Sequence, residues 1–337
     1  MDYIYIYGYF NEQNFNGKFE DKLNQEIVHI SSSFCSIHVV LKNGESYSFG
    51  NNIEGALGIG KLDFANSGFK KVKINDLIKE VYCGNEFTIW KNVENKLYIS
   101  GKGYGFEPCI LMDKKINHLD VYEKTLCFID ENDLVRIWWD FINDKKDVEF
   151  KMPSKPDDIK CGNSFVIVKC NIFVYKIDIS GEIKSLINLK SWGFRCSRAN
   201  KIKASNNYAL VLDDENNCWL YGKISPSLIR KNTDKPIAIN IENMFALPNS
   251  VFFINNNGTT LYFGENEHGQ LGDGTNERKY RTMQSNIYNV KFITGGNSFS
   301  VFVCKQFDSS LLSFCYDDFV PGQLNCTFES PDDILID

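Results

Sequence analysis

The stretch Tyr262–Gly274 reads Y-F-G-E-N-E-H-G-Q-L-G-D-G, and it decides the fold that we predict for this chain. An earlier stretch, Tyr47–Gly60, reads Y-S-F-G-N-N-I-E-G-A-L-G-I-G and repeats its pattern. In both, a strand-like segment ends in Phe-Gly, Asn follows two residues later, and G-x-L-G-x-G begins five residues after the first glycine. Glycine is favoured where φ is positive or where two backbone segments approach closely. The two copies therefore indicate an internal repeat that contains a glycine loop.

The residues before these loops define the rest of the repeating unit. An apolar strand begins near Ile37, Asn43-Gly44 is a two-residue hairpin signal, and an aromatic return strand ends at Gly50. The same order of segments recurs along the chain, although the region from Tyr122 to Trp192 is much diverged. Seven apolar inner strands are predicted, beginning near Ile37, Phe87, Leu126, Phe165, Tyr208, Val251 and Phe299.

The spacing of the strand-end glycines predicts the architecture. Gly8 and Gly50 are 42 residues apart, and so are Gly222 and Gly264. Repeats of about 40 to 50 residues with several strands per unit are typical of propeller blades. We therefore predict an all-β protein, a seven-bladed β-propeller with three- or four-stranded blades and few helices.

The two ends of the chain are expected to meet in one blade. Tyr3–Gly8 has the strand ending of the repeat but lacks the strand that should precede it, so it can complete the last blade. Leu311–Cys315 also resembles a return strand, and the sequence leaves open which of the two segments closes the ring. We expect a single propeller domain over residues 1–329 and an acidic, frayed tail over residues 330–337.

Composition narrows the class of protein. The 337 residues carry a net charge of -6, which disfavours general affinity for nucleic acid because that needs a basic surface. Eleven cysteines without a C-x-x-C motif favour reduced thiols in an intracellular protein. No apolar run approaches the roughly 20 residues of a membrane span, and the N-terminus lacks a positive signal-peptide region. A protein without membrane contact, and a monomer, is expected.

No catalytic or metal-binding constellation is predicted. The glycine loops are not followed by G-K-[ST] or by a helix pattern, so a phosphate-binding role is disfavoured. The four histidines show no ligand spacing, and Cys83 and Cys161 are interpreted as core thiols beside the propeller shaft. We expect no cofactor and no metal. The glycines interpreted as structural are Gly8, Gly50, Gly58, Gly60, Gly101, Gly222, Gly264, Gly269, Gly272 and Gly274.

One cationic segment stands out as a candidate contact for a partner. Arg278, Lys279 and Arg281 directly follow the second glycine loop. Loops on a rigid scaffold commonly carry binding residues. These three side chains are therefore candidates for binding an acidic protein surface, with a solvated loop as the simpler alternative.

The two glycine-loop stretches resemble repeats of the regulator of chromosome condensation family, and the resemblance extends from Tyr3 to Val303. It implies a seven-bladed propeller. That family commonly has a histidine four residues after the small residue that precedes the inner strand. In this chain aromatic residues stand in its place and are predicted to replace polar shaft residues: Phe87, Phe165, Tyr208 and Phe299.

The resemblance implies a protein-interaction propeller that binds a partner through its face loops and has no chemistry of its own. The alternative is a guanine-nucleotide exchange factor for a Ran-like small GTPase, the role of the family's founding member. For an exchange hairpin, Gly101–Pro108 is the nearest segment by position. Nucleosome or DNA binding is disfavoured by the net charge and by the missing basic tail. The expected location is nuclear for an exchange factor and otherwise cytoplasmic.

Overall fold

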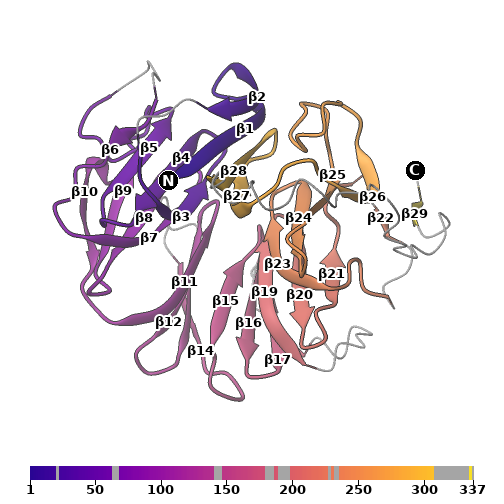
Figure 1. Ribbon diagram of the computed structural model, residues 1–337. Coiled ribbons are helices and arrows are strands. Elements are labelled where there is room, and N and C mark those ends of the chain that lie inside the picture. The colour runs from indigo at the N-terminus through magenta and orange to yellow at the C-terminus, as the bar shows by residue number, and fades with distance from the viewer. Residues whose placement is uncertain are drawn as a thin grey trace, which may run out of the picture.

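The chain forms a ring of β-sheets around a central axis (Figure 1). The computed structural model describes residues 1–19, 23–62, 68–139, 146–178, 186–188, 198–226, 229–230, 235–306 and 334–335. Every regular element in these ranges is a β-strand, and the strands form seven sheets of three or four strands and one two-stranded sheet. The prediction of an all-β, seven-bladed propeller is confirmed.

Each blade is an antiparallel meander whose strands follow one another from the axis outward. Blade I contains β3 (Ile27–Ser32), β4 (Ser36–Leu41), β5 (Ser46–Gly50) and β6 (Lys70–Lys71). Blade II contains β7 (Ile78–Cys83), β8 (Phe87–Asn92), β9 (Leu97–Gly101) and β10 (Gly105–Met112). Blade III contains β11 (Ile116–Tyr122), β12 (Thr125–Asp130), β13 (Val135–Trp139) and β14 (Lys146–Phe150).

The remaining blades continue around the ring in the same order. Blade IV contains β15 (Asp158–Cys161), β16 (Phe165–Cys170), β17 (Phe173–Asp178) and β18 (Leu186–Asn188). Blade V contains β19 (Ala199–Ser205), β20 (Tyr208–Asp213) and β21 (Cys218–Gly222). Blade VI contains β23 (Ile241–Ala246), β24 (Ser250–Asn255), β25 (Thr260–Gly264) and β26 (Lys279–Gln284). Blade VII contains β27 (Val290–Gly295), β28 (Phe299–Lys305), β1 (Asp2–Phe10) and β2 (Gln13–Phe19).

Blade VII closes the ring, because it combines strands from near the two ends of the chain, as predicted. β1 pairs with β28 in a continuous antiparallel register from Asp2 opposite Lys305 to Gly8 opposite Phe299. Tyr3–Gly8 is therefore a closing strand, and β2 covers its outer edge. The rival segment, Leu311–Cys315, lies outside the described residues. Near the end of the chain, β29 (Ile334–Leu335) pairs with β22 (Ile229–Arg230).

The seven predicted apolar strands are present, but they are not the innermost ones. They are the second strands of the blades, and the first strands lie between them and the axis. Each second strand is buried on both faces, because successive residues contact the blades on either side. In β8, Phe87 and Ile89 pack toward blade III, whereas Trp90 packs toward blade I. This is why these strands are continuous apolar runs rather than alternating ones.

The hydrophobic core is divided among the interfaces between neighbouring blades. The described residues form seven buried clusters, one for each interface around the ring. The cluster between blades VII and I contains Ile4 and Ile6 of β1 beside Ile37 and Val39 of β4. The N-terminal strand thus contributes to the core as well as to strand pairing.

The ring has two faces, which we name by their loops. The glycine-loop face holds the turns between first and second strands and the glycine loops between third and fourth strands. The hairpin face holds the turns between second and third strands and the segments that cross to the next blade. Asn43-Gly44, the predicted hairpin, forms such a turn between β4 and β5.

Candidate functional site

Five of the predicted glycines lie at or near the end of the third strand of a blade, where two backbone segments meet. A Cβ atom at Gly50 would lie 2.2 Å from the carbonyl oxygen of Cys35, just before the second strand. The next residue, Asn51, donates its N–H to that same oxygen at 2.8 Å. Glycine is therefore needed for this approach. The same arrangement of glycine, carbonyl and following N–H recurs at Gly8, Gly101, Gly222 and Gly264.

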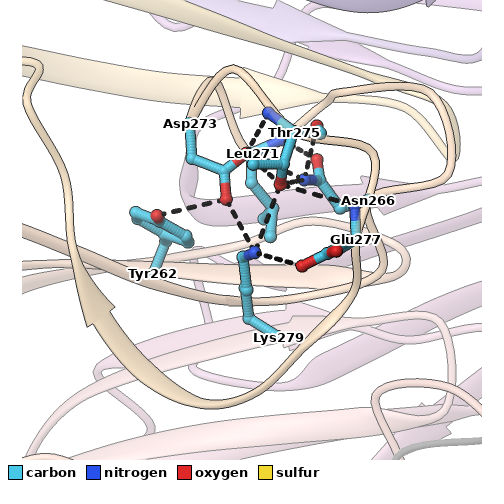
Figure 2. A network of polar contacts seen from close by, with 7 residues as sticks. All are labelled: Tyr262, Asn266, Leu271, Asp273, Thr275, Glu277 and Lys279. Atoms are coloured by element: carbon cyan, nitrogen blue, oxygen red, sulfur yellow. Dashed lines mark hydrogen bonds and ion pairs between the residues drawn. The ribbon is translucent and has the colours of Figure 1, made fainter.

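The other predicted glycines shape the glycine loops themselves. They have φ angles between 65° and 79°, in the left-handed region, at Gly58, Gly60, Gly269, Gly272 and Gly274. A buried asparagine holds each loop from inside. In blade VI, the Asn266 side chain accepts the N–H of Leu271 at 2.8 Å and donates to Asp273 and to the carbonyl of Thr275 (Figure 2). In blade I, Asn52 accepts the N–H of Leu57 at 2.8 Å and also donates to a loop carbonyl.

Both glycine loops pack against the next blade. From blade I, the carbonyl of Gly55 accepts a hydrogen bond from Ser100 of blade II at 2.9 Å. From blade VI, the carbonyl of Gln270 accepts one from Ser300 of blade VII at 2.5 Å. A Cβ atom at Gly272 would lie 3.1 Å from the ring of Tyr7 in β1. These loops therefore join neighbouring blades.

The three cations predicted as partner contacts differ in their surroundings. Arg278 pairs with Glu265 at 3.3 Å and with Glu267 at 2.8 Å. Lys279 pairs with Asp273 at 3.3 Å inside the network of the glycine loop (Figure 2). Arg281 lies further along β26 and is exposed. Arg278 and Lys279 thus have local carboxylate partners, whereas Arg281 faces solvent on the outermost strand of blade VI.

The aromatic residues that were predicted to line the shaft lie elsewhere. Phe87, Phe165, Tyr208 and Phe299 begin second strands and are buried in the clusters between blades. The reason is visible at the preceding glycine, because a Cβ atom at Gly84 would lie 2.4 Å from the Phe87 ring. The glycine makes room for the ring. The prediction that these aromatics replace polar shaft residues is therefore wrong.

The shaft itself is a polar cavity on the axis. It has a volume of about 300 Å³, and first-strand residues of all seven blades line it. One position on the first strand is equivalent in every blade. Its residue pairs with the third residue of the second strand. We call these seven residues the shaft ring: Ser31, Tyr82, Asp120, Lys160, Lys203, Phe245 and Thr294.

Charge in the shaft ring is confined to blades III to V. Asp120 accepts the backbone N–H of Cys161 at 2.8 Å, and burial raises the pKa of its carboxyl. Lys160 pairs with Asp158 at 2.8 Å; burial alone would lower its pKa, but Asp120 and Asp158 raise it overall. Burial, and then the charge of Lys160, lowers the pKa of Lys203. Nearby, burial lowers the pKa of His29 to about 4.

The two thiols interpreted as core cysteines do lie beside the shaft. Cys83 and Cys161 are both buried and occupy equivalent positions next to the shaft ring. Burial raises the pKa of Cys83 to about 12 and also raises that of Cys161. A thiol held in its protonated form is a poor nucleophile. The eight cysteines that the structure describes form no disulfide.

Within the described ranges, no group of three or more histidine, cysteine or acidic residues is arranged to hold a metal ion. The same ranges contain no helix of the length and apolarity that a membrane crossing requires. The shaft ring was not predicted, although a signal for it exists. Lys160 and Tyr82 directly precede the Cys-Gly pairs of their blades, so the repeat register could have aligned them.

Comparison with known proteins finds matches in structure. No family model matches the sequence, and no curated protein matches it. Human WBSCR16 superposes with a TM-score of 0.75 at 10% identity, covering 91% of this chain and 100% of that one. Yeast RCC1 (Prp20), solved bound to Kap60, gives a TM-score of 0.75 at 12% identity, covering 93% and 91%. Prp20p of Saccharomyces cerevisiae, solved separately, gives 0.72 at 12% identity, covering 93% of each chain.

These neighbours are propellers of the regulator of chromosome condensation (RCC1) type. The resemblance drawn from the glycine loops is therefore confirmed at the level of the fold, over nearly the whole chain. The structure of Prp20p was described together with its binding to Gsp1p and histones. At 10–12% identity, the similarity establishes the shared fold, and function has to be argued from the residues of this chain.

Proposed function

We propose that this chain is a protein-interaction propeller of the RCC1 type, which binds a protein partner through loops on its faces. One observation carries the proposal. Large apolar side chains are exposed at loop tips of a rigid closed ring, where they contribute nothing to the core. Leu77 and Val93, joined by a backbone hydrogen bond, are 55% and 56% exposed on the hairpin face. Adjacent exposed apolar residues are typical of protein contact sites.

The glycine-loop face offers a second set of exposed apolar residues. Ile53 and Leu62 lie in or beside the loop of blade I and are 53% and 47% exposed. The two faces can therefore be compared with matched substitutions. Leu77→Glu/Val93→Glu alters the hairpin face, and Ile53→Glu/Leu62→Glu alters the other. Both variants should keep the melting temperature of the unaltered protein, because none of the four side chains is buried.

The test is quantitative cross-linking and affinity capture from cell extract with the unaltered chain and the two variants. We expect the unaltered chain to capture a stoichiometric protein and one of the two variants to lose it. The variant that still captures the partner serves as the control for folding. Capture that is equal for all three chains, or absent for all three, would contradict binding through these faces.

Guanine-nucleotide exchange on a Ran-like GTPase is the second candidate. It is favoured by the similarity to Prp20p over 93% of this chain, since that protein is described with its binding to Gsp1p. Against it, Gly101–Pro108 does not project as a hairpin. Tyr104 donates its N–H to Gly101 in a tight turn, and the carbonyl of Phe106 accepts the N–H of Gly60 from the glycine loop of blade I.

Exchange is tested by the release rate of a fluorescent guanine nucleotide from a purified Ran-like GTPase. An exchange factor should accelerate release well beyond about tenfold, which corresponds to lowering the activation free energy of release by more than about 1.4 kcal/mol. A smaller effect removes exchange and leaves binding. Binding of this chain to histones is measured separately at about 0.15 M salt. The net charge of -6 favours binding to basic proteins over binding to DNA.

The proposed location follows the proposed function. An exchange factor for a Ran-like GTPase would be nuclear, and a propeller that only binds a partner would be cytoplasmic. Imaging of a tagged chain in the source cell distinguishes the two. We also propose that the chain is monomeric, which light scattering of the purified protein would test.

A further inference from the structure

We propose that the shaft binds a small oxyanion, a phosphate or carboxylate group, through the ammonium group of Lys203. The cavity encloses about 300 Å³ and is lined by all seven blades. A cavity of this size matches the lower end of small-molecule sites in proteins. The proposal is independent of which protein partner binds the faces.

Lys203 carries the argument because no group contacts its ammonium directly, while the charges of Asp120 and Asp158 act on it from farther away. It lies on β19 and lines the cavity, surrounded by the first strands of neighbouring blades. No hydrogen bond and no carboxylate within ion-pair distance of its ammonium group occur among the described residues. A charge in such surroundings loses part of its solvation, and a ligand of opposite charge that contacts it directly would offset the loss.

The other charged positions of the shaft ring are already partnered. Lys160 is paired with Asp158, and it also donates to the carbonyl of Ile159 at 2.9 Å. One carboxylate oxygen of Asp120 accepts the N–H of Cys161, which fixes its position. Lys160 and Lys203 come from adjacent blades and both line the cavity, and the charge of Asp120 acts on both. An oxyanion bound there would accept hydrogen bonds from Lys203.

The ring also contains a hydroxyl donor and an apolar surface. The Ser31 hydroxyl lines the cavity; its oxygen accepts the N–H of Cys83 at 3.1 Å, and the hydroxyl also interacts with the Cys83 thiol. Phe245 contributes an apolar side chain between Lys203 and Thr294 in ring order. A ligand with an anionic group and a short carbon skeleton would match both features.

The test compares two lysines of the same strand. Lys203→Gln removes the proposed ligand contact, whereas Lys201→Gln is the matched control because Lys201 is exposed and donates to the carbonyl of Glu242 at 2.7 Å. Binding of inorganic phosphate and of succinate is measured by calorimetry, with ionic strength held constant by sodium chloride. The two ligands distinguish a phosphate from a carboxylate site.

We expect at least one ligand to bind the unaltered chain and Lys201→Gln alike, and to bind Lys203→Gln more weakly by about tenfold or more. Equal affinity in Lys203→Gln, or no binding of either ligand to the unaltered chain at millimolar concentration, would overturn the proposal. A second measurement needs no ligand. In anion-poor buffer, Lys203→Met should raise the melting temperature because it removes a partly desolvated charge that no group contacts directly; a lowered value would show that Asp120 and Asp158 already neutralise Lys203, and would also overturn the proposal.

Discussion

Blades I and VI differ from blades III to V in where their buried polar interactions lie. In blades I and VI, Asn52 and Asn266 organise glycine loops that pack against the next blade. Blades III to V lack that loop motif in their sequence, and they place Asp120, Lys160 and Lys203 around the shaft. In blade IV, Asp178 pairs with the start of its second strand, where blade I has Gly50.

In this repeat, the loop motif marks residues that shape the backbone, and it does not mark the charged residues of the shaft. The loop motif is strongest where the chain must bring two backbone segments together and join two blades. The shaft charges occur in blades without the loop motif, so the glycine loops do not point to them; only the Cys-Gly register does. The candidate ligand site therefore lies in the part of the molecule that a search for repeats describes least well.

The largest expected effect comes from the closing strand, which lies beside the loop of blade VI. Deleting Met1–Gly8 removes the pairing of β28 and the buried side chains of Ile4 and Ile6. Each lost apolar side chain costs about 2–5 kcal/mol. We expect the melting temperature to fall by roughly 10 °C or more, measured by circular dichroism. Adding a peptide of residues 1–10 should restore part of the loss; an unchanged melting temperature would contradict ring closure by β1.

The second prediction compares two glycines of the loop-bearing blades. Gly50→Ala places a Cβ atom 2.2 Å from the Cys35 carbonyl, whereas Gly274→Ala meets no atom within 4 Å although φ is 77°. We expect a loss of roughly 3 kcal/mol or more for Gly50→Ala, from backbone displacement and strain. Gly274→Ala should lose only about 1–2 kcal/mol from φ strain. Urea unfolding measures both, and equal losses would show that the close approach at Gly50 is not required.

The third prediction contrasts a core histidine with a shaft histidine. Burial lowers the pKa of His38 to about 3 and that of His29 to about 4, from an ordinary value of 6.5. The unfolded chain therefore binds protons that the folded chain does not. The stability that these two neutral histidines contribute is fully present above pH 6.5. It is lost as the pH falls from 6.5 toward the pKa of each histidine in the folded chain.

The corresponding measurement is urea unfolding of His38→Gln and His29→Gln at several pH values. The unaltered chain should lose stability between pH 7 and pH 5. In each variant that loss in the free energy of unfolding should be smaller by on the order of 1–2 kcal/mol. The two should diverge below pH 4, where His29 becomes protonated in the folded chain while His38 stays neutral. If both variants follow the pH dependence of the unaltered chain, the histidines are not held neutral by burial.

Most of the fold could be predicted from the sequence because the repeat records local backbone requirements. Glycines at strand ends and apolar second strands are needed in nearly every blade, so they recur at a constant spacing. The prediction that the apolar strands are the inner ones was wrong about their distance from the axis. Apolar content indicates that a strand is buried, but it does not indicate which strand lies nearest the axis. The repeat register could have aligned the positions of Asp120, Lys160 and Lys203, but it could not show their contacts, because the three residues meet only when three blades are placed around one axis.

The cations after the second glycine loop show the same limit on a smaller scale. Sequence could not tell Lys279 from Arg281, because their difference arises from the contacts that each makes once β26 is in place. The Lys279 side chain is 17% exposed and donates to Thr275 at 3.2 Å, in addition to its ion pair with Asp273. Arg281 is exposed. Of the three cations, Arg281 is therefore the one most available to a partner without breaking contacts inside the loop.

The smallest expected effect is the stability difference between substitutions at these two positions. Lys279→Ala should lower the free energy of unfolding by about 0.5–1 kcal/mol, because it breaks a partly buried ion pair and a hydrogen bond. Arg281→Ala should leave it unchanged and should weaken capture of an acidic partner, if β26 contributes to binding. Raising the salt to about 1 M should shrink the Lys279→Ala effect by screening the ion pair. Equal stability of the two variants at low salt would show that the Lys279 contacts do not stabilise the loop, and would return Lys279 to the set of candidate partner contacts.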